Sequence, residues 1–181
     1  MRLVNIPKRL IDDTRGSEIA EAAAVLPLMF MVLLGIFWFG QAFSIYGAIT
    51  RAAQEGAKAG SYSPLCSTCG ADSLTQRKTN AVNAIQVALV GSKLDPAQAQ
   101  PPATPPTYTT CLGGTPSCDP AASSQYCIQA PVRLATDTGA SGVCGMSVSL
   151  QYPFQFWLPF TSLNKQKIWI TASALVKLEN Q

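Results

Sequence analysis

The residues best suited to chemistry in this chain are six cysteines, all of which follow a long uncharged segment near the N-terminus. An even number of cysteines on one side of such a segment is typical of an oxidising compartment, and it predicts up to three disulfides. Six cysteines can pair in many ways, so the sequence leaves the connectivity open. The disulfide candidates are Cys66, Cys69, Cys111, Cys118, Cys127 and Cys144.

The spacing Cys66-Ser-Thr-Cys69 allows two alternatives, a metal site and a redox pair. The chain contains no histidine, so a zinc ion would need four thiolates, and no second C-x-x-C motif is present. In a thioredoxin-type redox pair, a characteristic helix follows the cysteines. The sequence after Cys69 does not indicate such a helix. Disulfides are therefore the favoured interpretation, with no metal and no cofactor predicted.

Catalysis and nucleic-acid binding are both disfavoured by composition. The absence of histidine removes the commonest general base, and no G-x-S-x-G motif, phosphate-binding loop or dinucleotide fingerprint occurs. A net charge of +3, without basic residues interleaved with aromatics, does not indicate nucleic acid. The sequence predicts a protein that is not an enzyme, although folding could still pair two of its isolated carboxylates as in a glycosidase. These carboxylates are Asp72, Asp95, Asp119, Asp137 and Glu179.

One segment predicts a transmembrane helix. No Asp, Glu, Lys or Arg occurs between Ala22 and Thr50, and the apolar part extends to about Tyr46. At about 1.5 Å per residue, 25 helical residues reach about 37 Å, enough to cross a hydrocarbon core about 30 Å thick. The alternative, a buried core helix, would need apolar helices around it that the remaining sequence does not supply.

Basic residues predict the orientation of this helix. Four precede it (Arg2, Lys8, Arg9 and Arg15), whereas only Arg51 and Lys58 closely follow it. The N-terminus is therefore expected in the cytoplasm and the cysteine-bearing part on the far side. A cleavable secretory signal ending at Ala57-Lys58-Ala59 is the alternative, but the apolar region is longer than such signals have, and the site lies well beyond its end.

Glu21 lies where the chain enters the apolar segment. A carboxylate at membrane depth is costly unless it reaches the interface or a partner, although near a helix N-terminus it also interacts favourably with the helix dipole. Cleavage after Gly16 would give Ser17 a new ammonium group, and the ammonium of a neighbouring subunit could then neutralise Glu21. Further along, Pro27 predicts a kink or local unwinding.

Small residues recur every four positions along the same helix and continue beyond its apolar part. Such a ridge lets another helix approach closely, and it predicts helix–helix packing, with either this chain or another as the partner. The alternative is the ordinary abundance of small residues in membrane-proximal helices. The small-residue ridge consists of Gly40, Ser44, Ala48, Ala52, Gly56 and Gly60.

The exported part predicts an α+β domain. Apolar residues at spacings of three and four predict an amphipathic helix from Asp72 or Ser73 to Gly91, and residues 95–124 form a Pro-rich loop. Alternation predicts strands at 146–152 and 168–178 that pair antiparallel, with a weaker strand at 125–130. The aromatic turn 152–160 either caps the core of the domain or meets a membrane surface or partner.

Three stretches of the N-terminal helix carry a family resemblance. Residues 15–27 (RGSEIAEAAAVLP), 34–43 (LGIFWFGQAF) and 52–57 (AAQEGA) resemble TadE-like minor pilins, or pseudopilins, of the tight-adherence (Tad, or Flp) pilus system. A weaker likeness covers 145–179, including the final strand at 170–174. The chain has Ala22, Trp38 and Gln41 where the family commonly has an aromatic, an acidic and a basic residue.

The resemblance implies a pilin-like α+β fold, cleavage by a prepilin peptidase between Gly16 and Ser17, and a role in assembling a type IV-like pilus. The expected organisation is a cytoplasmic leader (1–16), a transmembrane and membrane-proximal helix (17–60) and an exported domain (61–181). The implied location is the bacterial inner membrane, spanned once, or the pilus itself. Other pilins or pilus-assembly proteins are the expected partners. The alternative function is a membrane-tethered binding domain that enters no filament.

Overall fold

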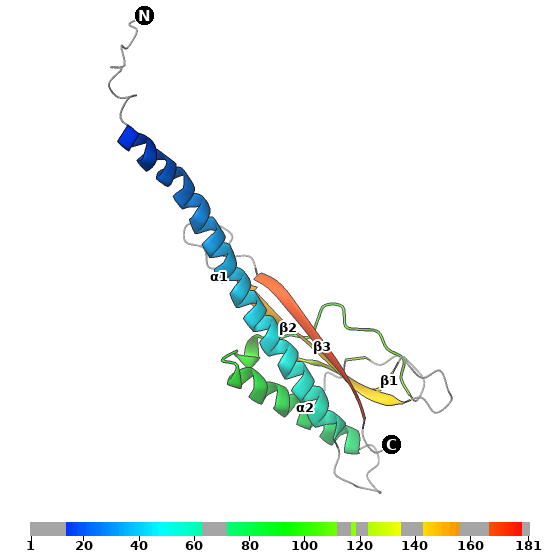
Figure 1. The fold of residues 1–181 in the computed structure, drawn as a ribbon. Helices are drawn as coiled ribbons and strands as arrows, with labels where there is room; N and C mark the ends of the chain where they lie inside the picture. Colours follow the sequence, from blue (N-terminus) through cyan, green and yellow to red (C-terminus); the bar gives the residue numbers. More distant parts are fainter. Residues whose placement is uncertain are drawn as a thin grey trace, which may run out of the picture. The chain divides into compact units, whose positions relative to one another are not determined.

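The computed structural model describes residues 14–62, 72–111, 117–118, 123–134, 143–155 and 167–178, with side chains from Ile19 in the first helix and Leu74 in the second. The chain divides into two compact units, Met1–Gln41 and Ala42–Gln181, here called unit 1 and unit 2. The long helix α1 (Thr14–Ser61) contributes to both units (Figure 1). Unit 2 adds the helix α2 (Asp72–Gly91), a 3-10 turn η2 (Pro96–Gln98) and three strands. The α+β prediction is confirmed.

In unit 1, α1 exposes almost every described side chain, and the apolar ones dominate. The α-helix continues through Pro27 without interruption, so the local unwinding predicted there is not observed. Trp38 is the exception to this exposure, with 8% of its surface accessible, and its ring meets that of Phe37 edge-on at 5.8 Å. The segment from Ile19 to Ser61 is long and apolar enough to be a candidate membrane span.

The predicted amphipathic helix is confirmed as α2. Ala81, Ile85 and Leu89 are fully buried at a spacing of four, because every fourth residue returns to nearly the same helix face. The helix ends at Gly91, and Lys93 then adopts a positive φ of 58°. This reversal lets the Leu94 amide donate to the Leu89 carbonyl at 2.9 Å, which satisfies one of the carbonyls left open at the helix end.

The sheet has the order β1-β2-β3, with both pairings antiparallel as predicted for the two long strands. Its strands are β1 (Cys127–Arg133), β2 (Cys144–Gln155) and β3 (Lys167–Lys177). Val148 of β2 lies opposite Ile128 of β1 and Ala174 of β3. Val148 and Ile128 belong to the core that α1 and α2 share with the sheet, and the half-buried Ala174 packs against it.

Burial differs sharply between β2 and β3. On β2 the apolar positions Met146 and Leu150 are buried, but so are Ser147 and Ser149 on the opposite face. The strand is central, so β1 and β3 cover its two edges, and the burial of residues on both of its faces shows that each face is also covered. Among the described strands, β3 forms the far edge of the sheet, and its outward positions are exposed. The sequence pattern predicted one apolar and one mixed face for both strands and did not distinguish them.

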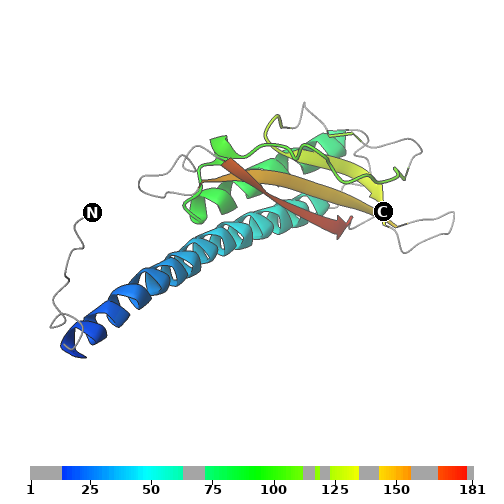
Figure 2. The same ribbon diagram turned by 90° about the horizontal axis from the view of Figure 1, so that it is seen from above.

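The described part of the Pro-rich loop is attached to the sheet. Gln100 pairs with Gln151 through two backbone hydrogen bonds of 2.8 and 2.9 Å, and Thr110 forms a bridge to Val132. The segment between these pairs is visible as the green trace in Figure 2. Its many prolines lack an N–H and cannot extend a ladder, which explains why pairing is confined to single positions.

Candidate assembly helix and neighbouring groove

The predicted processing site lies in the first turns of α1. Gly16 and Ser17 have helical backbone, and Glu21 follows one turn later with an exposed side chain. No described side chain of unit 2 is needed to position Glu21, because helical periodicity alone places it at the start of the apolar surface. A carboxylate that stands out from an apolar helix is available to a cation from outside the helix.

The small-residue ridge divides into an exposed and a buried part. Gly40 and Ser44 are exposed and Ala48 is half-buried, whereas Ala52, Gly56 and Gly60 are buried in unit 2. A Cβ placed on Gly40 would meet nothing within 4 Å. The first part of the small-residue ridge is therefore exposed, whereas its last part packs inside unit 2.

Gly56 and Gly60 are the positions at which α1 approaches its neighbours most closely. A Cβ on Gly56 would overlap Ile85 Cγ1 and lie 3.2 Å from the Ala81 carbonyl oxygen of α2. A Cβ on Gly60 would overlap Met146 Sδ of β2 and lie 3.1 Å from Ala81 Cβ. This part of the ridge thus packs against the chain's own α2 and sheet. Only its exposed part, which includes Gly40 and Ser44, is accessible to another helix.

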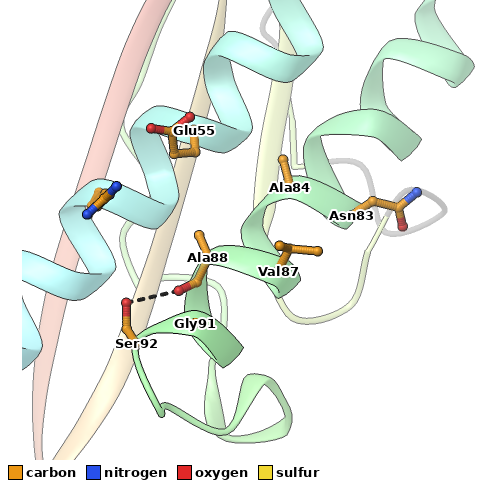
Figure 3. Close-up of a pocket in the computed structure, with 8 residues that line it drawn as sticks. Glu55, Asn83, Ala84, Val87, Ala88, Gly91 and Ser92 are labelled. Carbon is orange, nitrogen blue, oxygen red and sulfur yellow. Dashed lines mark hydrogen bonds between the residues drawn. The ribbon is translucent and has the colours of Figure 1, made fainter.

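A groove in unit 2 was not foreseen from the sequence. It encloses about 560 Å³ between α1 and α2, and Figure 3 shows the residues around it. Arg51 and Glu55 line it from α1, and Val87, with 73% of its side chain exposed, lines it from α2. Val87 is an apolar residue outside the predicted apolar stripe of α2. Its position in the sequence could have indicated an exposed apolar surface on this side of the helix. The remaining lining residues are Asn83, Ala84, Ala88, Gly91 and Ser92.

Two disulfides connect the Pro-rich region with the sheet. Cys111 is bonded to Cys144 at the start of β2, and Cys118 is bonded to Cys127 at the start of β1. The prediction of disulfides is confirmed for these four cysteines, and the structure supplies the pairing that the sequence left open. Cys66 and Cys69 lie outside the described residues, as do residues 156–160 of the aromatic turn. Residues 152–155 were predicted to belong to that turn, but they continue β2, where Tyr152 and Phe154 are buried.

Residues 16–58 match the sequence model of the TadE-like protein family. This match confirms the family resemblance, and it covers most of α1 and ends close to the buried Gly56. No curated protein and no solved structure matches the chain. The matched segment includes the first part of α1, whose described side chains are mostly exposed and apolar.

Proposed function

We propose, on the premise that this is a TadE-like, Tad pilus-associated protein, that it is a minor pilin whose helix α1 joins neighbouring subunits during pilus assembly. In this proposal the N-terminus lies in the cytoplasm, α1 crosses the inner membrane once, and unit 2 is exported. A prepilin peptidase cuts between Gly16 and Ser17, and the cut helix is the part that other pilins contact.

The observation that carries the proposal is the division of α1 at the boundary between its units. Beyond Ala42 the helix packs into the core of its own chain through Ile49, Ala52 and Gly56. Before that point the TadE-like segment presents exposed apolar side chains and the exposed Glu21. In a membrane that surface is stable in lipid, and it also suits packing against equivalent helices, where small residues and polar pairs provide specificity.

The first experiment is to determine the mature N-terminus by mass spectrometry on protein purified from its native membrane. We expect a chain that begins at Ser17, because the resemblance of residues 15–27 to TadE-like minor pilins implies cleavage between Gly16 and Ser17. A methylated Ser17 would be additional support. A chain that begins at Met1 would contradict the processing step and favour an uncut assembly factor or a tethered binding domain. A chain that begins at Gly60 would contradict the membrane anchor.

The substitution Glu21→Ala is expected to reduce pilus formation by at least about tenfold while unit 2 still folds, because a buried or membrane-embedded ion pair loses far more than a surface pair when one partner is removed. The measurement is pilus abundance by electron microscopy beside membrane levels of the variant. Glu55→Ala is the matched control, because it removes a carboxylate from the same helix outside the apolar segment. Normal piliation in Glu21→Ala would favour the tethered binding domain instead.

A further inference from the structure

One edge of the sheet in unit 2, that of β3, carries backbone groups that pair with no described part of the chain. The Leu178 amide, just after this strand, donates to the Cys144 carbonyl of β2 at 2.9 Å. Backbone groups alternate in direction along a strand, so the even-numbered residues of β3 bond to β2 and the odd-numbered residues turn their N–H and C=O groups away from it. Within the described part of the chain, no residue pairs with these outward groups. They are a template for one more strand.

The opposite edge of the sheet, formed by β1, is closed by features that β3 lacks. Pro131 removes a backbone N–H from β1, and the register against β2 shifts between Gln129 and Val132. The Thr109 carbonyl of the Pro-rich region also accepts from the Arg133 amide on this edge at 2.7 Å. Each of these features limits pairing with another chain. In contrast, β3 contains no proline and pairs with β2 over all 11 of its residues without a shift.

The side chains along the edge of β3 can also contact an added strand. Trp169 and Leu175 are each 40% exposed, and the exposed Thr171 and Ser173 lie between them on the same face of the sheet. Directly opposed aromatic, apolar and hydroxyl side chains stabilise neighbouring strands, at a Cβ separation of about 5 Å. The edge therefore offers outward backbone groups together with an uncharged row of side chains.

Charge decides which strand this edge can accept. The charged residues of β3 are Lys167 and Lys177, one at each end of the strand, and both are exposed. A second copy of β3, paired in full register in either direction, would place lysine opposite lysine at both ends, and like charges that face each other destabilise strand pairing. A strand with an acidic residue at each end would instead form a favourable charge pair with each lysine.

We propose that the free edge of β3 accepts an extended segment of another protein, with an acidic residue at each end of the segment and uncharged residues between them. The segment forms a fourth strand beside β3, held by the outward backbone groups and by the two lysines. The inference concerns unit 2 alone, and it depends neither on cleavage after Gly16 nor on a role of α1 in pilus assembly.

The test uses the full chain in detergent and a fluorescent peptide of 11 residues, the length of β3, with glutamate at both ends and alternating threonine and valine between them. Fluorescence anisotropy should show binding. Hydrogen exchange followed by NMR should show the outward amides of Thr171, Ser173 and Leu175 protected by at least about tenfold when the peptide is bound, because pairing removes them from solvent. Absence of binding, or protection that avoids the edge of β3, would overturn the proposal.

A first control changes only the peptide. N-methyl groups on alternate amides keep its charges but block hydrogen bonds along one of its two edges. Two such peptides, methylated on the one or the other set of amides, should differ in affinity by at least about tenfold, because only one set faces β3. Equal binding of the two methylated peptides would show that the peptide is held by charge alone, and it would overturn strand addition.

A second control changes the chain. Ser173→Pro removes an outward N–H and leaves the hydrogen bonds to β2 in place, so unit 2 should fold and peptide binding should fall at least about tenfold. Ser173→Ala keeps the N–H and should bind as wild type does. If Ser173→Pro does not fold, the pair of methylated peptides decides the question with the chain unchanged. Self-association of the chain that Ser173→Pro abolishes would assign the edge to a second copy and overturn the proposal.

The two lysines provide a separate test of the charge preference. Lys167→Glu with Lys177→Glu should weaken binding of the glutamate-ended peptide by about tenfold, because two favourable surface charge pairs become repulsive. The same variant should bind a peptide with lysine at both ends more tightly than the wild-type chain does. If exchanging the charges changes neither affinity, the edge does not select an acidic segment.

Discussion

Gly56→Val is expected to destabilise unit 2 by about 2–3 kcal/mol, the upper part of the range for overpacking a core. A Cβ at this position already overlaps Ile85 Cγ1 and lies 3.2 Å from a backbone oxygen of α2. Ile85 is fully buried and the oxygen belongs to a helix, so neither can move away without separating α1 from α2. The measurement is urea unfolding of the full chain in detergent, followed by circular dichroism.

Gly47→Val provides the control for this prediction. Gly47 lies in the same helix and also in unit 2, but a Cβ there would meet nothing within 4 Å. Because glycine is the poorer helix former, this change is expected to leave stability unaltered or raise it by a few tenths of a kcal/mol. If Gly56→Val unfolds at the same urea concentration as Gly47→Val, α1 and α2 do not pack as described.

A double variant tests the specific contact. Ile85→Ala alone should cost about 2–5 kcal/mol through the cavity that it leaves. Combining it with Gly56→Val should cost clearly less than the sum of the two separate changes, because the valine side chain occupies part of that cavity. Simple additivity would show that the two residues are not neighbours.

Removal of the Cys111–Cys144 disulfide, as Cys111→Ala with Cys144→Ala, is the second large expected effect. The two cysteines are 33 residues apart, and constraining a loop of that length in the unfolded chain stabilises the fold by about 3–4 kcal/mol. Cys118→Ala with Cys127→Ala opens a loop with a separation of only 9 residues and should cost about 2–3 kcal/mol. Chemical denaturation of both variants under non-reducing conditions measures the difference.

Peptide mapping without reduction is the control for the disulfide experiment. Each double variant should retain the other disulfide, so that Cys118 remains linked to Cys127 when Cys111 and Cys144 are replaced. A variant lacking Cys111 and Cys144 that is as stable as wild type would contradict the role of this disulfide in holding the Pro-rich region against β2. A reversed order of the two effects would show that loop length is not the determining factor.

The elements of unit 2 and the candidate membrane segment could be predicted from residue patterns alone. The spacing of Ala81, Ile85 and Leu89 predicted α2, and the alternation around Val148 and Ala174 predicted two strands that pair. These patterns are readable because each helix or strand buries one face, whatever covers it. The uncharged segment after Glu21 was equally clear, since bilayer thickness sets a length that few other structures require.

The tertiary structure alone decided which parts of the chain meet. Gly40 and Gly56 belong to one ridge of the sequence, yet only Gly56 packs against α2. Likewise Ser147 and Leu175, which pair across β2 and β3, differ in burial because β2 is central and β3 forms an edge. The cysteine pairing and the groove beside Val87 also depend on contacts between distant segments. Periodicity records which face of an element is covered, whereas the identity of the covering residues follows from the relative placement of whole elements, which local sequence does not encode.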